Sequence, residues 1–123
     1  MSVATFVAAS IGCGCGAMIR YALSTLRREH HLPWPTLVAN LLGTLLLGAA
    51  AALVDSDSLS TSAAFVIGGG IAGGLTTFST LAVDSVVMFK ASRPTAIAYL
   101  AITGIGGIAA GAIGWALASH LVV

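Results

Sequence analysis

Four long stretches of this chain contain no Asp, Glu, Lys or Arg, and they constrain its fold more than any other feature. They cover residues 1–19, 32–54, 58–83 and 94–123, and they are 19, 23, 26 and 30 residues long. A helix that crosses the hydrocarbon core of a bilayer needs about 20 mostly apolar residues. The sequence therefore predicts an all-α membrane protein, a single domain with four transmembrane helices. The predicted spans lie near 3–23, 34–54, 62–89 and 94–120.

The overall composition points the same way. Hydrophobic residues make up 58% of the chain and charged residues 7%, against roughly 25% charged in soluble domains. So few charges cannot cover a soluble globule, which excludes a soluble enzyme, a disordered chain and a nucleic-acid binder. The net charge of +1 gives no general attraction to polyanions. We expect a protein that is not an enzyme.

The basic residues fall on one side of the predicted membrane. The first and third loops hold or adjoin Arg20, Arg27, Arg28, Lys90 and Arg93, whereas the second loop holds only Asp55 and Asp57. By the positive-inside rule, loops 1 and 3 face the cytoplasm and both termini face outward, in a cell (plasma) membrane. A cleaved signal peptide places positive charge before its apolar run. Here Arg20 follows that run, so we expect the first span to be retained.

Small residues recur at helical spacing in two spans. The fourth span carries Gly104, Gly107, Gly111 and Gly114, and the first carries Gly12, Gly14 and Gly16. Small-xxx-small spacing lets helices approach closely in lipid, so we expect tight packing at these glycines, either within the chain or against a partner. Four spans alone make a thin bundle, which favours an oligomer.

Two pairs of residues that could suggest a metal or redox site are not expected to form one. Cys13 and Cys15 point about 200° apart on a helix, so they neither pair nor chelate one ion. His30 and His31 lie in the first loop, where a solvated pair is expected in place of a metal site.

A single amide interrupts the apolar second span. Asn40 lies about six residues into it, and polar groups at this depth usually face the bundle interior or a water-filled path. The sequence leaves two interpretations open, a helix–helix hydrogen bond and a pore-lining donor.

The third span carries the strongest signal. Residues 68–74 include five glycines, and residues 76–80 include four hydroxyl side chains, which makes a poor continuous helix. We expect a break here, because irregular backbone at membrane depth persists where protein buries it or where it lines a cavity. Broken helices commonly bind ions through freed carbonyls. The alternative is a hydroxylated packing seam.

In the fourth span, Tyr99, Thr103 and Gly107 lie one turn apart on one face and form a short polar track.

The polar groups in the spans suit an anion. Apart from Arg20 and Asp84, which we place near span ends, no ionisable group lies in the spans, so we expect no buried carboxylate for proton exchange. Amide N–H groups, hydroxyls and the edge of a phenylalanine ring all favour negative charge.

A small multidrug-type exporter is an alternative, but it needs an embedded carboxylate, usually in the first span, where residues 1–19 have none. A structural membrane subunit without a pore would need neither Asn40 nor the hydroxyl run.

Three motifs together resemble the CrcB/Fluc family of fluoride channels. They are Gly14-x-Gly16-Ala17-x-x-Arg20-Tyr21, Val38-x-Asn40-x-x-Gly43 and Gly73-Gly74-Leu75-Thr76-Thr77-Phe78-Ser79-Thr80. The resemblance implies a fluoride-specific channel that lets fluoride leave the cytoplasm, built as an antiparallel, dual-topology dimer with two pores. It also implies a central structural sodium ion on the carbonyls of Gly73 and Thr76. The implied pore residues are Asn40, Phe78, Thr77, Ser79, Thr80, Tyr99 and Thr103, and Arg20 matches a structural basic residue.

Two positions depart from the family pattern. Where the family often has a second phenylalanine and, three residues later, a glutamate, this chain has Leu81 and Asp84. The loss of one aromatic contact and the one-sided distribution of basic residues suggest that the partner is an oppositely oriented paralogue.

Overall fold

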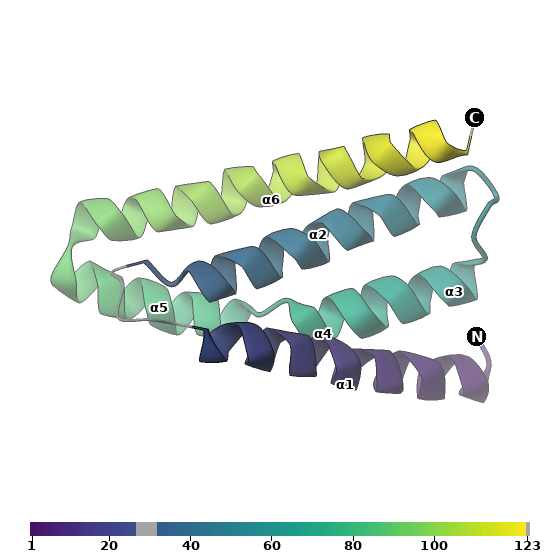
Figure 1. Ribbon diagram of the computed structural model, residues 1–123, viewed down its shortest axis with the longest axis horizontal. Coiled ribbons are helices and arrows are strands. Elements are labelled where there is room, and N and C mark those ends of the chain that lie inside the picture. The colour runs from purple at the N-terminus through teal and green to yellow at the C-terminus, as the bar shows by residue number, and fades with distance from the viewer. Residues whose placement is uncertain (27–31, 123) are drawn as a thin grey trace.

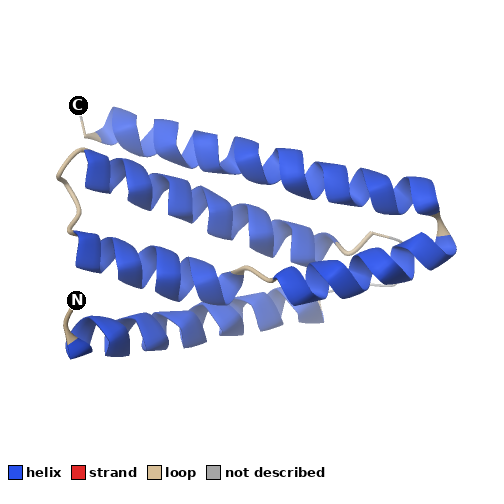
Figure 2. Cartoon of the chain, turned by 180° about the vertical axis from the view of Figure 1, so that it is seen from behind, coloured by secondary structure: helices blue, strands red, loops and turns tan. Residues whose placement is uncertain are grey.

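The computed structural model describes residues 1–26 and 32–122 of the chain. Its helices are α1 (Val3–Thr25), α2 (Trp34–Asp55), α3 (Thr61–Phe65), the π-helix η1 (Val66–Ala72), α4 (Gly73–Leu75), α5 (Phe78–Ala91) and α6 (Arg93–Leu121). The described part is helical with loops and contains no strand (Figure 2). The predicted histidine pair and two of the predicted loop arginines fall within residues 27–31, outside the described residues.

Within the described residues, four helical stretches are long and apolar enough to cross a membrane. The third one, Thr61–Ala91, combines α3, η1, α4 and α5 and is bent between α4 and α5. The helix limits differ from the predicted ranges by at most two residues. The prediction of an all-α membrane protein with a broken third span is therefore confirmed.

Hydroxyl and proline residues set where the helices begin. Ser2 and Ser60 accept hydrogen bonds from the third backbone N–H of α1 and α3, at 3.2 Å in both cases. Such N-caps satisfy N–H groups that have no partner inside the helix. Pro35 and Pro94 occupy the first turns of α2 and α6, where a missing N–H costs nothing.

Helix α2 is the centre of the bundle. It packs along α6 on one side and against η1 on the other, while α1 packs on η1 and α4. Both termini and the α2–α3 loop lie at one end of the molecule, and the α5–α6 turn lies at the opposite end (Figure 1). Beyond the break, α5 leaves α1 and packs against the start of α6.

Glycines permit close contacts between helices. A Cβ atom on Gly74 would collide with the backbone carbonyl of Cys13, and one on Gly114 would collide with that of Leu45. The predicted packing role is thus confirmed at these contacts and at Gly12, Gly16 and Gly111. At Gly14, Gly104 and Gly107 a Cβ atom would meet nothing of this chain within 4 Å, so packing of these glycines against a partner stays a prediction.

The bundle covers little of its own surface. The most apolar 18-residue windows of the four spans are 17%, 22%, 28% and 11% buried. A small core beside the break contains the buried residues Met88, Ala96 and Tyr99, with Leu37 and Leu81 against them. Most of the apolar surface therefore faces lipid or another chain.

Candidate functional site at the break of the third span

Two extended residues separate α4 from α5. Thr76 has φ −78° and ψ 155°, and Thr77 has φ −149° and ψ 125°, so neither continues the helix. Before the break, η1 winds with the wider hydrogen-bonding pattern of a π-helix, which is often found at functional sites. The predicted interruption thus falls at the junction of the glycine run and the hydroxyl run.

The side-chain amide of Asn40 binds both the backbone N–H and the backbone carbonyl of Thr77. Thr77 N–H donates to Asn40 Oδ1 at 2.8 Å, and Asn40 Nδ2 donates to Thr77 O at 3.2 Å. In an uninterrupted α-helix the N–H of residue 77 would donate to the carbonyl of Gly73. Here Asn40 Oδ1 accepts the hydrogen bond from that N–H instead. One of the two interpretations of Asn40, an interhelical hydrogen bond, is therefore observed.

The last helical hydrogen bond before the break ends on Ala72, and two carbonyls beyond it have lost their helical donors. Ala72 O receives both Thr76 N–H at 2.9 Å and Thr76 Oγ1–H at 3.0 Å. Across the break, no backbone N–H of the described residues donates to Gly73 O or Thr76 O. These are the carbonyls that helix ends leave for another partner.

A close approach of α2 supports this geometry. A Cβ atom on Gly43 would collide with Thr76 Cγ2, so glycine is the residue that lets Thr76 pack against α2. Asn40 lies almost one turn before Gly43 and reaches Thr77. Together the two residues fix the position of the break on α2.

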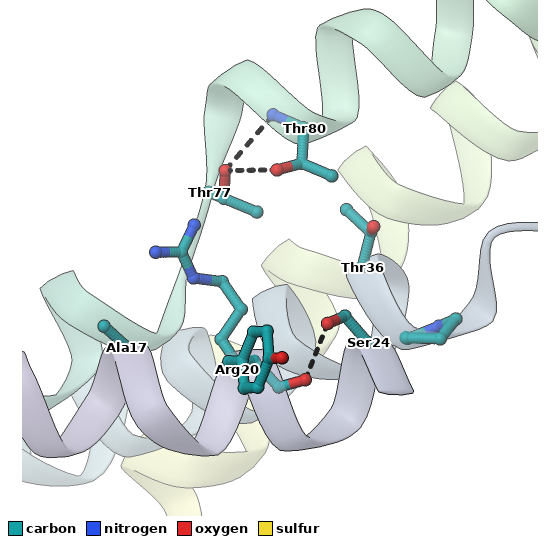
Figure 3. A pocket seen from close by; sticks show the side chains of 8 residues that line it. Ala17, Arg20, Ser24, Thr36, Thr77 and Thr80 are labelled. Atoms are coloured by element: carbon teal, nitrogen blue, oxygen red, sulfur yellow. Dashed lines mark hydrogen bonds between the residues drawn. The ribbon is translucent and has the colours of Figure 1, made fainter. Parts of the chain in front are cut away.

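One pocket, called here the arginine pocket, lies between α1, the start of α2 and the break. Its lining residues are Ala17, Arg20, Tyr21, Ser24, Pro35, Thr36, Thr77 and Thr80. Figure 3 shows the Arg20 guanidinium extending from α1 toward Thr77. Thr77 caps α5 by accepting from Thr80 N–H at 3.2 Å, and its hydroxyl donates to Thr80 Oγ1 at 3.0 Å. A fixed positive charge here faces several hydroxyl groups.

A second pocket, called here the asparagine pocket, lies on the other side of the break. Its lining includes Asn40 and Thr44 from α2, Gly73, Thr76, Thr77, Phe78 and Leu81 from the third span, and Thr103 and Gly107 from α6. Phe78 is 82% exposed, so its ring projects from the chain. Thr77 lines both pockets and is the wall between them.

The structure brings most of the predicted site residues together, and it separates two from the pockets. Tyr99 is fully buried in the core beside Met88, and only the Thr103 and Gly107 part of the predicted track reaches the asparagine pocket. Thr103 donates to Tyr99 O at 2.8 Å. Ser79 is exposed and bonds to Thr77 Oγ1 at 3.3 Å, outside the lining of either pocket.

The expectation of no buried carboxylate is wrong. Asp84 is 7% exposed, and it lies in the middle of α5. Its Oδ2 accepts a hydrogen bond from Thr36 Oγ1 at 2.9 Å. Position along one long span suggests that Asp84 lies near a span end, but the break makes α5 a separate helix that packs against α6 and α2.

Two contributors from α2 were missed. Thr36 and Thr44 each lie four residues from Asn40, and four residues is about one helical turn. Thr44 Oγ1 donates to Asn40 O at 2.6 Å, and Thr36 lines the arginine pocket. Thr36, Asn40 and Thr44 recur every four residues, and this spacing predicts one polar face on α2.

Four helices long enough to span a membrane define a multi-pass membrane protein. The break in the third span lies between two pockets lined by polar groups that can bind an ion. The family model for CrcB-like proteins (Camphor Resistance, CrcB) matches residues 7–115. The chain belongs to this family.

Several curated relatives carry one functional name. The chain is 39% identical over 101 residues to "Fluoride-specific ion channel FluC 1" of Streptococcus pneumoniae, covering 82% of this chain and 88% of the relative. It is 33% identical over 124 residues to "Fluoride-specific ion channel FluC 2" of Halalkalibacterium halodurans, covering 98% and 90%. It is 37% identical over 110 residues to "Fluoride-specific ion channel FluC" of Salinibacter ruber, covering 85% and 82%.

Proposed function

We propose that this chain is a subunit of a fluoride channel, through which fluoride leaves the cytoplasm passively. The observation that carries the proposal is the pair of pockets that share Thr77. Both offer hydrogen-bond donors, and one holds a guanidinium. The names of the relatives, fluoride-specific ion channels, agree with this chemistry.

The anion would meet a series of donors on either side of the break. Arg20 attracts it into the arginine pocket, because an arginine stays charged at any physiological pH. The hydroxyls of Thr77 and Thr80 can rotate to donate, and Ser79, outside both pockets, would reach the anion only by turning away from Thr77 Oγ1. These groups replace part of the water shell of a small anion without offering it a full counter-charge at the narrowest point, so release remains possible.

Beyond Thr77 the donors come from three elements. The Asn40 amide has two N–H groups, of which one is bonded to Thr77 O. The other is our proposed fluoride donor, with the Thr103 hydroxyl and the edge of the Phe78 ring, which carries partial positive charge. Tyr99 would reach the path only after a rearrangement of the core around it.

A second subunit completes the site in this proposal. The asparagine pocket contains amide, hydroxyl and carbonyl groups at membrane depth, and lipid tails cannot satisfy such groups. Phe78 and the unpacked Gly107 lie at the same opening. An antiparallel dimer that covers this opening would bury them and line a pore with residues of both chains.

A sodium ion fits the chemistry of the break. Gly73 O and Thr76 O would hold it, as hard oxygen ligands that the break has released from the helix. Hard cations such as Ca²⁺ and Mg²⁺ take roughly six oxygen ligands or more, and two carbonyls fall short. We therefore place the ion between the breaks of two subunits, where it would add structural stability to the dimer.

The distribution of basic residues favours a partner of opposite orientation. All five of the Lys and Arg residues belong to loops 1 and 3 or their edges, so we propose that those loops are cytoplasmic. Copies with one orientation cannot pair antiparallel. A paralogue with its basic residues on the opposite side would supply the second subunit. In such a heterodimer, Leu81 would replace a phenylalanine in only one of the two pores.

A liposome efflux experiment tests the function. Vesicles loaded with fluoride and containing the chain, co-expressed with an oppositely oriented homologue from the same cell, should release fluoride to an electrode without a proton gradient. Chloride-loaded vesicles are the control and should retain their anion. Proton-coupled movement of an organic cation would support the exporter alternative, and no flux of any solute would support the structural-subunit alternative.

A further inference from the structure

We propose that a groove at the α5–α6 turn binds one anionic phospholipid. Its lining is Val86, Phe89, Lys90, Arg93 and Ile97. Three of these residues are apolar and two are cationic. None of them belongs to the arginine pocket or the asparagine pocket.

The short turn brings the two cations to one rim. Lys90 lies in the last turn of α5, Arg93 is the first residue of α6, and only Ala91 and Ser92 separate them. Ser92 is extended, with φ −157° and ψ 107°. Both cationic side chains are exposed. The negative end of the α5 dipole and the positive end of the α6 dipole meet at this turn and offset each other, so the side-chain charges dominate the local field.

No acidic side chain lines this groove in the described part of the chain. Asp84 on α5 is buried and bonded to Thr36. Asp55 and Asp57 belong to the α2–α3 end, and that end lies opposite the α5–α6 turn (Figure 1). The groove therefore attracts an anion.

The apolar lining selects an anion with a hydrocarbon part. Val86, Phe89 and Ile97 are 56%, 39% and 58% exposed, and they continue from the cations along α5 and α6 toward the membrane interior. Lysine and arginine also lay apolar stems on such surfaces. A phospholipid phosphate would bind Lys90 and Arg93, with an acyl chain along the three apolar residues. A zwitterionic lipid carries its own ammonium group, which weakens this attraction.

Lipid-specific fluorescence quenching tests the site on the full chain. A variant with Trp34→Phe and Trp115→Phe carries Phe89→Trp as its only tryptophan, in bilayers of phosphatidylcholine containing either brominated phosphatidylglycerol or brominated phosphatidylcholine. A basic residue at a membrane surface contributes about fivefold in affinity for anionic lipid. We expect a preference for phosphatidylglycerol of at least that size, reduced in high salt because ions screen the charges.

Matched variants locate the binding. Lys90→Gln with Arg93→Gln should bring the ratio close to one, while the charge-preserving pair Lys90→Arg with Arg93→Lys should retain the preference. A chain whose only tryptophan is Trp115, near the opposite end of α6, should show no preference. Equal quenching by the two lipids at the Phe89→Trp probe would overturn the proposal, and so would a preference that survives both glutamine substitutions.

Discussion

The side-chain amide of Asn40 binds the backbone of Thr77 twice, accepting from Thr77 N–H at 2.8 Å through its oxygen and donating to Thr77 O at 3.2 Å through its nitrogen. This pair joins α2 to the break of the third span. It also links two parts of the proposed function. The donor proposed for fluoride and the carbonyl proposed for sodium both depend on where the Thr77 peptide is held.

Two substitutions at Asn40 should separate charge from structure. Asn40→Asp keeps an oxygen that accepts Thr77 N–H, so we expect the fold to survive while the negative charge abolishes fluoride flux. Asn40→Leu removes both bonds and leaves the Thr77 N–H without its partner, at a cost of about 1–3 kcal/mol. Efflux and thermal unfolding should be measured together. Flux near the wild-type level in Asn40→Asp would remove Asn40 from the pore.

Adjacent glycines at the break should respond differently to alanine. A Cβ atom on Gly74 would lie 2.8 Å from the Cys13 backbone carbon, whereas one on Gly73 would meet its nearest atom, Gly68 O, at 3.5 Å. Gly74→Ala should destabilise the chain by about 1–3 kcal/mol, and Gly73→Ala should leave the unfolding temperature close to that of the parent. Equal stability losses would contradict the packing of α1 on α4.

The proposed sodium site depends on backbone, so side-chain changes at Thr76 should matter little. Thr76→Ser keeps a hydroxyl for Ala72 O, and we expect nearly normal flux and dimer formation. Gly73→Leu adds bulk where we place the partner subunit, and it should impair assembly more. Exchange of sodium for choline during purification should lower the melting temperature of the parent dimer. The opposite ranking of the two variants would count against carbonyl ligands.

A pair of threonines on α2 offers a test of the buried carboxylate. Thr36→Val removes the hydroxyl that donates to Asp84, and we expect a loss of about 1–3 kcal/mol because a buried carboxyl oxygen loses a donor. Thr44→Val is the matched control, since Thr44 donates to a backbone carbonyl of its own helix. Chemical or thermal unfolding of both variants checks the order. A smaller effect at Thr36 than at Thr44 would argue that the contact contributes little.

The partner hypothesis makes a prediction for the chain reconstituted alone. If most copies insert with one orientation, few antiparallel pairs form, and fluoride flux should be far below that of the co-expressed pair. Adding basic residues to the α2–α3 loop, as Ser56→Lys with Ser58→Lys, should increase flux from the single chain, because the chain could then insert in both orientations. Full conduction by the unmodified chain alone would exclude an obligate heterodimer.

The sequence predicted the spans and the break well because both follow from local composition. Charge-free length sets a span, and residues 68–80 combine poor helix formers with hydroxyls that cap a new helix. The surroundings of Asp84 and Tyr99 depended on tertiary packing. Once the break makes α5 a separate helix, Asp84 meets Thr36, and Tyr99 enters a core with Met88. Periodicity along one helix carries no information about such crossings.

The small share of each span that the chain buries has a thermodynamic consequence. In α6 it is 11% of the most apolar window, so most of the surface of this helix is left for lipid or a second subunit to cover. Partners that bind only the folded chain raise its stability by mass action. The unfolding free energy of this protein is therefore a function of protein-to-lipid ratio and partner concentration, and dilution in detergent should lower it without any change in sequence.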